Sequence, residues 1–366
     1  MKAITFEGKS TVAYATADDP RIEAPGDVLV RVRAAGICGS DLHPYHEREK
    51  GLDHGTVMGH EFVGEVIEVG SEVSGTRRGD VVFSPFTTSC GRCFYCRRGL
   101  TCRCTEGELF GWVHEGAGLH GAQAEYVRVP LADGTLMKVP DGVSDASALL
   151  LGDILSTGFF CAEMAGVGVL GDEATVVSRL SAGRAGPGGT YVVVGCGPVG
   201  MMTILAARYL GAEELFAVDA LPDRLAVAEK LGAVPLDYGH DDVVDIIHEA
   251  TGGRGADAVM EAVGARGASE LAISVLRPGG VMSSVGVHTD ERFGFTPVDA
   301  YDKNLTFRSG RCPARAYMQR LAPLVRDNLI DPEFVFSHRL PLSEGVRGYE
   351  IFDKKLEGCT KVLLEP

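Results

Sequence analysis

Apolar and polar positions follow two different patterns along the chain. From the amino terminus to about residue 150, short segments alternate apolar and polar residues, as strands with one buried face do. This region is therefore predicted to be mostly β with irregular loops. Its clearest strands are DVLVRVRAAG (27–36), EFVGEVIEVG (61–70) and AEYVRVP (124–130).

The second pattern begins at Tyr191. Short, continuously apolar segments alternate there with amphipathic helices, which is typical of a doubly wound parallel sheet. We expect a strand at YVVVG, a helix to about residue 210, a strand at ELFAVD, a helix over 221–231, and further apolar segments at DVVDIIHEA, ADAVMEAVG and VMSSVGV. From about residue 304, a strand in NLTFRSG, a helix in AYMQRLAPLVRDNL and the closing KVLLEP are expected to finish the sheet and return to the first domain.

Two domains follow from these patterns, and a length of 366 residues fits that number. The fold is predicted to be α/β, with a Rossmann-type domain at 156–304 and a mostly β domain made of 1–155 and 305–366. Residues 167–189 are rich in glycine and alanine without a clear period. We interpret them as a surface insertion; a cover over the mouth of a cleft is the alternative.

The net charge and the absence of a recognisable signal peptide bear on where the protein is located and what it binds. The chain has 35 Lys and Arg against 50 Asp and Glu, a net charge of −15, so no overall field attracts nucleic acid or anionic lipid. The first residues, MKAITFEGKS, lack the apolar core of a signal peptide, and glycine and proline interrupt the weakly polar stretch 191–207. We expect a cytoplasmic protein without nucleic-acid or membrane partners, whose 10 cysteines are reduced.

Four cysteines in CGRCFYCRRGLTCRC predict a metal site. Their spacing, C-x2-C-x2-C-x7-C, allows four thiolates to surround one Zn²⁺ at about 2.3 Å in a closed structural site. A redox C-x-x-C pair or an iron–sulfur cluster is the alternative, but redox pairs begin a helix and this run is loop-like. We expect a structural-zinc lobe at 85–110 with Cys90, Cys93, Cys96 and Cys104 as ligands and Cys102 left over.

The run VVVGCGPVG has the spacing of a dinucleotide-binding turn. Gly195 permits the tight turn, Gly197 lets a pyrophosphate approach the helix N-terminus, and Gly200 allows the helix to pack closely on the strand. Because the motif lies between an apolar strand and a helix, it predicts a dinucleotide site that includes Pro198 and Val199.

Asp219 ends the next predicted strand. A carboxylate at that place accepts hydrogen bonds from an unmodified ribose and repels a 2′-phosphate, which favours NAD(H) over NADP(H). An ordinary loop acid is the alternative. Arg224, further along, is either a contact to the adenosine ribose or a surface arginine without a role.

A second metal site is suggested by GICGSDLH and GHEF. A cysteine and a histidine, each at the edge of a predicted strand, supply half of an open zinc site. A buried cysteine and a hydrogen-bonded histidine without metal explain the same pattern. The residues concerned are Cys38, Ser40, Asp41 and His43 in the first motif and His60 and Glu61 in the second.

The order of these motifs resembles that of a known family. CGSDLH, GHEFVGEV, the four-cysteine run, GAQAEYVRVP, GDILSTG and VVVGCGPVG occur in the order found in zinc-containing medium-chain alcohol dehydrogenases, over nearly the whole chain. GDILSTG and FGW…GAQAEYVRVP make the chain most similar to the branch related to glutathione-independent formaldehyde dehydrogenases. The resemblance implies a GroES-like catalytic domain, a Rossmann domain and a homodimer or homotetramer.

The resemblance also implies a catalytic zinc bound by Cys38, His60 and Asp153, with water or the substrate oxygen as the fourth ligand. Many family members have a second cysteine where this chain has Asp153; one thiolate, one carboxylate and one neutral imidazole still balance Zn²⁺. Asp153 as the N-cap of the helix ILSTGFFCAEM is the alternative. Asp41 would orient His60. Glu61 resembles the family's carboxylate near the metal, or else it is a buried partner of a base.

Proton transfer and cofactor contact are implied in the same way. Ser40 and His43 match the hydroxyl and the histidine that carry away the substrate proton, which an alcohol must lose before hydride leaves. Thr157 matches the family's contact to the nicotinamide. Gly39 stands where some members place a basic residue on the pyrophosphate, so phosphate binding here depends more on the glycine-rich turn.

The function expected is a zinc-dependent oxidoreductase that transfers a hydride between NAD(H) and a small alcohol or aldehyde, formaldehyde included, with two zinc ions per chain. A polyol or secondary-alcohol dehydrogenase is the alternative within the family. A zinc-free quinone reductase is disfavoured by Cys38, His60 and the four cysteines together. A nucleotide-binding protein without catalysis is disfavoured by the pair Ser40 and His43.

Overall fold

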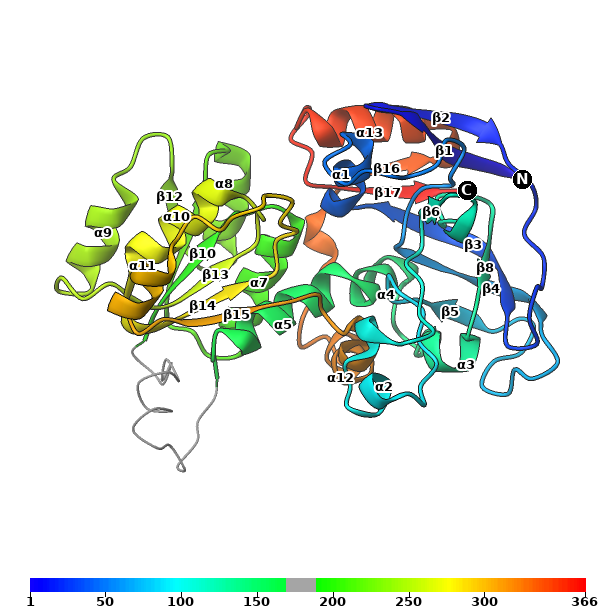
Figure 1. Cartoon of the computed structure of the whole chain (residues 1–366), viewed down its shortest axis with the longest axis horizontal. Helices are drawn as coiled ribbons and strands as arrows, with labels where there is room; N and C mark the ends of the chain where they lie inside the picture. The colour runs from blue at the N-terminus through cyan, green and yellow to red at the C-terminus, as the bar shows by residue number, and fades with distance from the viewer. Residues whose placement is uncertain (169–188) are drawn as a thin grey trace. The chain divides into compact units, whose positions relative to one another are not determined.

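The computed structural model describes residues 1–168 and 189–366, which form two compact units (Figure 1). The first unit consists of Met1–Ser156 with Pro313–Pro366, and the second of Thr157–Cys312. Of the insertion expected at 167–189, residues 169–188 lie outside the described part of the chain.

The first unit is built on a seven-stranded, mostly antiparallel sheet. β3 lies between β17 and β4 and also pairs with β8, so strands from both ends of the chain meet on it. The predicted β region is therefore confirmed, and the C-terminal strand joins it. In sheet order the strands are β16 (Phe336–Pro341), β17 (Lys361–Glu365), β3 (Val28–Ile37), β4 (Phe62–Val69), β5 (Val81–Phe83) and β9 (Met137–Lys138), with β8 (Tyr126–Val129) beside β3.

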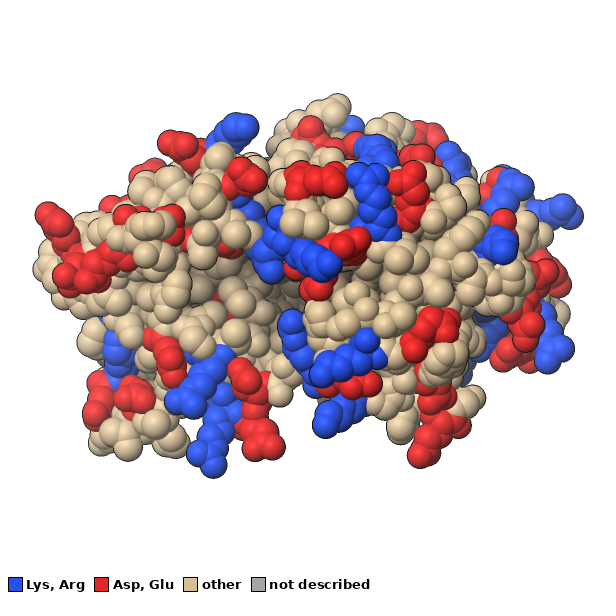
Figure 2. All heavy atoms as spheres, turned by 90° about the horizontal axis from the view of Figure 1, so that it is seen from above, with Lys and Arg blue, Asp and Glu red and all other residues tan. Residues whose placement is uncertain are grey.

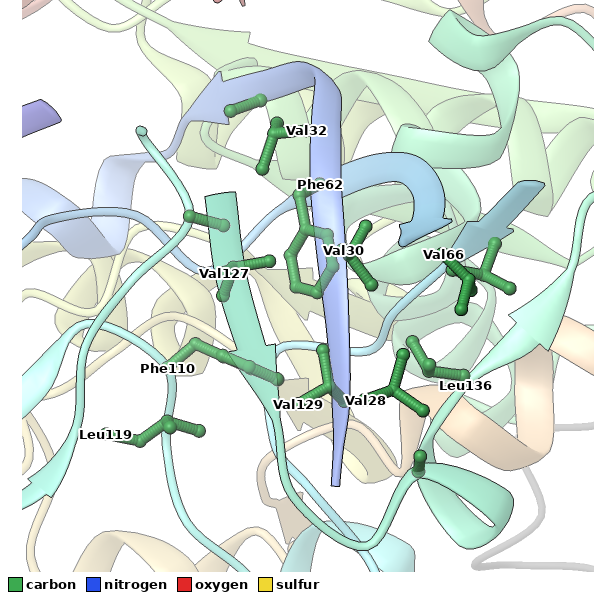
Figure 3. Close-up of a cluster of buried hydrophobic side chains, with 14 residues drawn as sticks. Val28, Val30, Val32, Phe62, Val66, Phe110, Leu119, Val127, Val129 and Leu136 are labelled. Atoms are coloured by element: carbon green, nitrogen blue, oxygen red, sulfur yellow. The ribbon is translucent and has the colours of Figure 1, made fainter. Parts of the chain in front are cut away.

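Alternation along β3 explains why this strand forms and which face it buries. Val30 and Val32 are buried, whereas Arg31 and Arg33 between and after them are exposed. The buried side chains belong to an apolar core in which the rings of Phe62 and Phe110 meet edge to face, 5.3 Å apart (Figure 3). The polar and apolar pattern thus places one face of the sheet in the core.

Short hairpins and helices complete the first unit. A second apolar core lies under β1, β17 and α13, and α12 packs against α4. The remaining strands are β1 (Lys2–Gly8), β2 (Thr11–Thr16), β6 (Trp112–His114) and β7 (Ala117–Leu119); the helices are α1 (Leu42–Tyr45), α2 (Phe94–Arg97), α3 (Ala132–Thr135), α4 (Asp145–Gly152), α12 (Ala314–Arg326) and α13 (Gly345–Asp353).

The second unit is the doubly wound parallel sheet that the second pattern predicts. All five pairings between its six strands are parallel. In sheet order the strands are β12 (Val234–Asp237), β11 (Glu214–Asp219), β10 (Thr190–Val194), β13 (Ala256–Glu261), β14 (Leu276–Ser284) and β15 (Thr306–Ser309). The helices are α7 (Pro198–Tyr209), α8 (Pro222–Lys230), α9 (Val243–Ala250), α10 (Arg266–Val275) and α11 (Pro297–Asp302), together with α5 (Ile154–Met164) from Thr157 onward.

The structure changes three details of the sequence analysis. The second domain boundary, expected after residue 304, lies after Cys312, because β15 pairs with β14 and so belongs to the parallel sheet. The apolar segment DVVDIIHEA is helix α9, capped by Asp242. β12 was not expected, because VPLD is short and contains a proline.

No single helix in the described residues is long and apolar enough to cross a bilayer. α4 and α5 meet the length and composition only when taken together, and Asp153 separates them.

Surface ion pairs contribute little to the stability of either unit. Acidic and basic side chains are interspersed on the face shown in Figure 2, and exposed pairs such as Arg31–Glu65 and Arg92–Glu106 close to 2.6 Å. Exposed ion pairs of this kind contribute about 0–1 kcal/mol each. Stability therefore depends on the buried apolar cores.

We expect Phe110→Ala to destabilise the first unit by about 3–5 kcal/mol, because it opens a cavity beside Phe62. The fluorescence of the single tryptophan, Trp112 in β6 of the same unit, would report unfolding in denaturant. Leu329→Ala, at a side chain that is 60% exposed, is the control and should change stability by less than about 0.5 kcal/mol. Equal effects of the two substitutions would contradict this assignment of the core.

Candidate active site

Three potential metal ligands come together from distant parts of the first unit. Cys38 follows the end of β3, His60 precedes β4, and Asp153 lies at the break between α4 and α5. All three side chains are buried, and their ligand atoms lie within 4.8 Å of one another. The structure therefore brings together the three residues that the sequence analysis proposed as zinc ligands.

The distances between these atoms suit one tetrahedral zinc ion. Asp153 Oδ2 lies 3.3 Å from Cys38 Sγ and 3.4 Å from His60 Nε2. Ligand atoms at the bond lengths of zinc are separated by about 3.3–3.8 Å at the tetrahedral angle. Donor chemistry fits as well, because a thiolate, an imidazole and a carboxylate are the usual ligands of catalytic zinc. This contact favours a ligand role for Asp153 over a purely helix-capping one.

The electrostatics of the cluster favour a bound cation. Burial, followed by the charges of Asp153 and Glu61, raises the pKa of the Cys38 thiol. Burial opposes a charge on His60, but Asp41, Asp153 and Cys38 raise the pKa of its imidazole well above the usual value. Without a metal, protons on Cys38 and His60 would neutralise the site; a metal ion displaces such protons from its ligands.

His60 is held in the orientation that a metal requires. Its Nδ1 lies 3.0 Å from Asp41 Oδ1 and donates its proton there, so Nε2 is the nitrogen from which a metal ion would displace the remaining proton. Nε2 faces Asp153 and lies 3.2 Å from Ser40 Oγ. The expectation that Asp41 orients His60 agrees with this geometry, and Ser40 lies beside the metal-binding atom.

Glu61 forms a buried ion pair that the sequence analysis did not identify. Lys361 Nζ lies 2.7 Å and 2.5 Å from the two carboxylate oxygens of Glu61, and both side chains are completely buried. β17 and β4 flank β3, and a Cβ at Gly36 of β3 would lie 2.1 Å from Glu61 Oε2. The glycine therefore leaves room for the pair. Glu61 is the partner of a base, and a lysine within the apolar run KVLLEP was the signal for it.

The pair formed by Glu61 and Lys361 affects the site through its charges. Burial raises the pKa of Glu61, while the Lys361 ammonium opposes that rise. Burial opposes the charge on Lys361, but Glu61, Cys38 and Asp153 together raise the pKa of its amine. A buried cation therefore faces the negative groups of the site.

The other catalytic candidates, His43 and Thr157, are both buried. His43 is buried in α1, and its Nδ1 has no hydrogen-bond partner among the described residues. Burial lowers the pKa of His43, so its ring is neutral at pH 7 and can accept a proton. Within residues 1–168 and 189–366, no hydrogen bond joins Ser40 to His43. Thr157 is buried in α5 and belongs to the second unit.

The four cysteines of the lobe form the second cluster. The Sγ atoms of Cys90, Cys93, Cys96 and Cys104 lie within 4.8 Å of one another. Several backbone N–H groups point at these sulfurs, for example Cys90 N at 3.2 Å from Cys104 Sγ. Backbone N–H groups of Cys96 and Thr105 lower the pKa of Cys93 to about 6, whereas burial raises the pKa of Cys90 and of Cys96. A metal ion would therefore have to displace protons from some of these thiols. None of these four cysteines is in a disulfide, so no disulfide competes for the cluster.

The glycine-rich turn lies between β10 and α7 in the second unit. Gly195 has φ +92°, and a Cβ on Gly200 would lie 1.8 Å from the Gly195 carbonyl oxygen, so both positions require glycine. Among the described residues, a Cβ on Gly197 would meet only Arg224, at 3.6 Å. α7 begins at Pro198, and its N-cap Gly197 offers no side chain to the N–H groups of the first turn. This arrangement fits a pyrophosphate on the helix N-terminus.

The side chain of Asp219, the last residue of β11, is hydrogen-bonded to the glycine-rich turn. Its Oδ2 accepts a hydrogen bond from the backbone N–H of Cys196 at 2.8 Å, and its Oδ1 accepts one from Ala220 at 2.8 Å. Arg224 Nη1 lies 3.7 Å from the same carboxylate, and the buried Arg224 Nε has no partner among the described residues. Both candidate cofactor residues therefore lie next to the turn.

Family comparisons agree with both units. The model of the alcohol dehydrogenase GroES-like domain matches residues 24–141, and the model of zinc-binding dehydrogenases matches residues 198–327. Zinc-type alcohol dehydrogenase B of Aspergillus flavus is 42% identical over 355 residues, which is 96% of this chain and 79% of the relative. The chain belongs to the zinc-binding alcohol dehydrogenase family. It is a zinc-dependent oxidoreductase acting on alcohols with a nicotinamide cofactor.

Two further relatives bear on the branch within the alcohol dehydrogenases. Alcohol dehydrogenase TADH from Thermus sp. ATN1 matches the structure with a TM-score of 0.87 and 40% identity, covering 100% of this chain and 99% of that one. The glutathione-independent formaldehyde dehydrogenase of Bacillus subtilis is 30% identical over 416 residues, covering 100% of this chain and 97% of the relative. The expected relation to formaldehyde dehydrogenases is thus found, at lower identity than the relation to the alcohol dehydrogenases.

In this dehydrogenase the loop that follows β13 depends on Glu261. Its Oε1 accepts hydrogen bonds from the backbone N–H groups of Val263 and Gly264 at 2.7 and 2.6 Å, and its Oε2 accepts one from Ser284 at 2.6 Å. His288 Nε2 lies 3.2 Å from Oε2. Burial opposes ionisation, yet these contacts lower the pKa of Glu261 below its usual value. Val263 in turn contacts the glycine-rich turn at Gly195.

We expect Glu261→Gln to lower the stability of the dehydrogenase by about 2 kcal/mol at neutral pH, since it removes charge-assisted hydrogen bonds. A carboxylate with a lowered pKa stabilises the folded state above its ordinary pKa and loses that effect as the pH falls. The difference between wild type and variant should therefore shrink below about pH 4.5.

Thermal denaturation followed by circular dichroism at several pH values measures this difference. Glu270→Gln is the matched control, because Glu270 lies in the same unit with a 50% exposed side chain. It should have little effect at any pH. A difference at Glu261 that stays constant into acid would contradict the role of its charge.

Proposed function

We propose that this alcohol dehydrogenase oxidises small alcohols, or reduces small aldehydes, with NAD(H), and that each chain holds a catalytic and a structural zinc ion. The observation that carries the proposal is the convergence of Cys38, His60 and Asp153, whose ligand atoms lie within 4.8 Å of one another in a buried site. The four cysteines of the lobe fill a tetrahedral shell among themselves, which suits a structural role.

Zinc bound there supplies a Lewis acid for the substrate oxygen, and the nicotinamide supplies or accepts the hydride. The chain's own residues would bind the zinc ion and orient the substrate. Cys38 and Asp153 balance the dication, and neutral His60 leaves the site uncharged overall. Glu61 is balanced separately by Lys361.

Ser40 and His43 are proposed to move the substrate proton. Ser40 Oγ lies 3.2 Å from the metal-facing Nε2 of His60, so a substrate hydroxyl near the metal lies within reach of it. His43 follows on the next turn, and its lowered pKa keeps it free to accept the proton. Its unpartnered Nδ1 leaves a hydrogen bond to be made by a bound molecule.

NAD(H) is proposed over NADP(H) on the basis of Asp219. Its carboxylate is held by the N–H groups of Cys196 and Ala220 and has lone pairs left for ribose hydroxyls. A 2′-phosphate at the same place would meet a fixed negative charge. Arg224, beside Gly197 and Asp219, is proposed to contact the adenosine ribose, and Thr157 the nicotinamide.

Self-association is proposed through the edge of the parallel sheet. β15 ends the strand order in the described part of the second unit, so its outer edge is available to a second copy. Apolar side chains lie exposed in the segment before it, at Phe293, Val298 and Tyr301, the last 83% exposed. Pairing across a two-fold axis would cover both features and give a homodimer.

We expect two zinc ions per chain in the purified protein, measured by elemental analysis. Asp153→Ala should remove the catalytic ion and reduce alcohol oxidation by at least about 100-fold, while the lobe keeps its metal. Cys93→Ser is the matched variant for the lobe: it should release the other ion and lower thermal stability. If Asp153→Ala retained both ions, Asp153 would not be the third ligand.

We expect kcat/KM with NAD to exceed that with NADP by about 100-fold, because Asp219 repels a 2′-phosphate. A panel of small alcohols, aldehydes including formaldehyde, and polyols, followed by nicotinamide absorbance, measures this ratio and the substrate preference together. Asp219→Ser should reduce the ratio. Asp237→Ser is the control, since Asp237 holds the corresponding position on β12. A preference for NADP in the wild type would contradict the role of Asp219.

A further inference from the structure

A buried amide links the active site to the second core of the first unit. The side chain of Gln123, from the motif GAQAEYVRVP, is completely buried. Its Nε2 donates to the Gly36 carbonyl oxygen at 2.9 Å and to Asp41 Oδ2 at 3.2 Å. Its Oε1 accepts a hydrogen bond from the hydroxyl of Tyr349 at 2.9 Å. Tyr349 lies in α13 and is also completely buried.

The orientation of this amide is decided by its neighbours. A carbonyl oxygen and a carboxylate can only accept hydrogen bonds, so the NH2 group of Gln123 must face Gly36 and Asp41. The amide oxygen then faces Tyr349, whose hydroxyl donates to it. Tyr349 thus holds the amide in the orientation that presents a donor to Asp41.

The Asp41 carboxylate accepts three hydrogen bonds, one of them from the metal ligand His60. Its Oδ2 accepts from the backbone N–H of Cys38 at 2.9 Å and from Gln123, and its Oδ1 accepts from His60 Nδ1 at 3.0 Å. The direction of the carboxylate therefore sets both the position of His60 and the backbone at Cys38. Two of the three metal ligands depend on one side chain.

Close packing leaves Gln123 little freedom to move. A Cβ at Gly59, the residue before His60, would lie 2.4 Å from Gln123 Cγ, and Gly59 has φ +89°. The backbone N–H of Gln123 donates to Met58 at 2.9 Å, so the two segments run side by side. The amide is consequently packed closely against the turn that carries His60.

We propose that Tyr349 and Gln123 are positioning residues for the catalytic metal, acting in the order Tyr349, Gln123, Asp41, His60. The inference rests on the proposed zinc site at Cys38, His60 and Asp153. Removing the Tyr349 hydroxyl would leave Gln123 Oε1 buried without a donor, and the amide would lose the contact that keeps its NH2 group on Asp41. The carboxylate, and with it His60, would then be less well fixed.

The test uses cobalt(II) as the metal probe in the full-length protein. Its visible spectrum reports the geometry of the ligands, and subtraction of the Asp153→Ala spectrum removes the contribution of the lobe. The variants are Tyr349→Phe, Gln123→Met and the double variant, and the rate of metal loss to a chelator is measured for each. Tyr191→Phe is the matched control, because the buried Tyr191 hydroxyl has no hydrogen-bond partner among the described residues.

We expect Gln123→Met to speed metal loss by about 10-fold and Tyr349→Phe by about 3-fold or more, each with a changed cobalt spectrum and a lower kcat at little altered KM. Because Tyr349 acts through Gln123, the double variant should behave like Gln123→Met alone. Lobe metal content and thermal midpoint show that each variant is folded, and Tyr191→Phe should resemble the wild type.

Three results would overturn the inference. One is a Tyr349→Phe protein with the spectrum and metal-loss rate of Tyr191→Phe. Another is a double variant whose effect is the product of the two single effects, since independent contributions would then replace a chain of contacts. The third is a wild-type protein with no metal outside the lobe, which would also overturn the proposed function, whereas the first two leave that function intact.

Discussion

Buried negative charge is the constraint on which the active site depends. Cys38, Glu61 and Asp153 lie within one buried region, where an unbalanced anion costs several kcal/mol. Lys361 balances Glu61 inside the sheet, and the two remaining anions match the charge of one zinc ion. With zinc bound, the charges of the site balance without added protons on Cys38 or His60, and the ligands that achieve this come from three distant segments of the chain.

The sheet of the first unit satisfies this constraint through the order of its strands. β3 lies between β17 and β4, so Lys361 and Glu61 meet across it, and Gly36 leaves the space that the pair occupies. The same strand ends at Ile37, next to Cys38. The turn before β4 carries His60, with Gly59 making room for Gln123. Cys38, His60 and the side chains that support them thus share one framework of strands, to which the break between α4 and α5 adds Asp153.

The second unit offers its negatively charged cofactor a helix N-terminus instead of a metal ion. The glycine-rich turn presents the start of α7, where unpaired N–H groups favour an anion. Asp219 and Glu261 hold the turn and the neighbouring loop by accepting backbone N–H groups. Two carboxylates therefore hold the glycine-rich turn and the neighbouring loop in place beside the helix N-terminus at which a pyrophosphate would bind.

Local sequence predicted most of the elements, the two-domain organisation, the cysteine lobe and the glycine-rich turn. Alternation identified β3, β4 and β8, the run of cysteines identified the lobe, and the spacing of Gly195, Gly197 and Gly200 identified the turn, because each is a short-range pattern with a direct physical cause. Asp153 as a zinc ligand came from family resemblance, since its position in the chain also suits a helix cap. Only the tertiary structure revealed the partner of Glu61 and the path from Tyr349 through Gln123 to Asp41. Those contacts join residues far apart in the chain, and which buried polar groups satisfy one another is decided by strand order and packing, which no local pattern encodes.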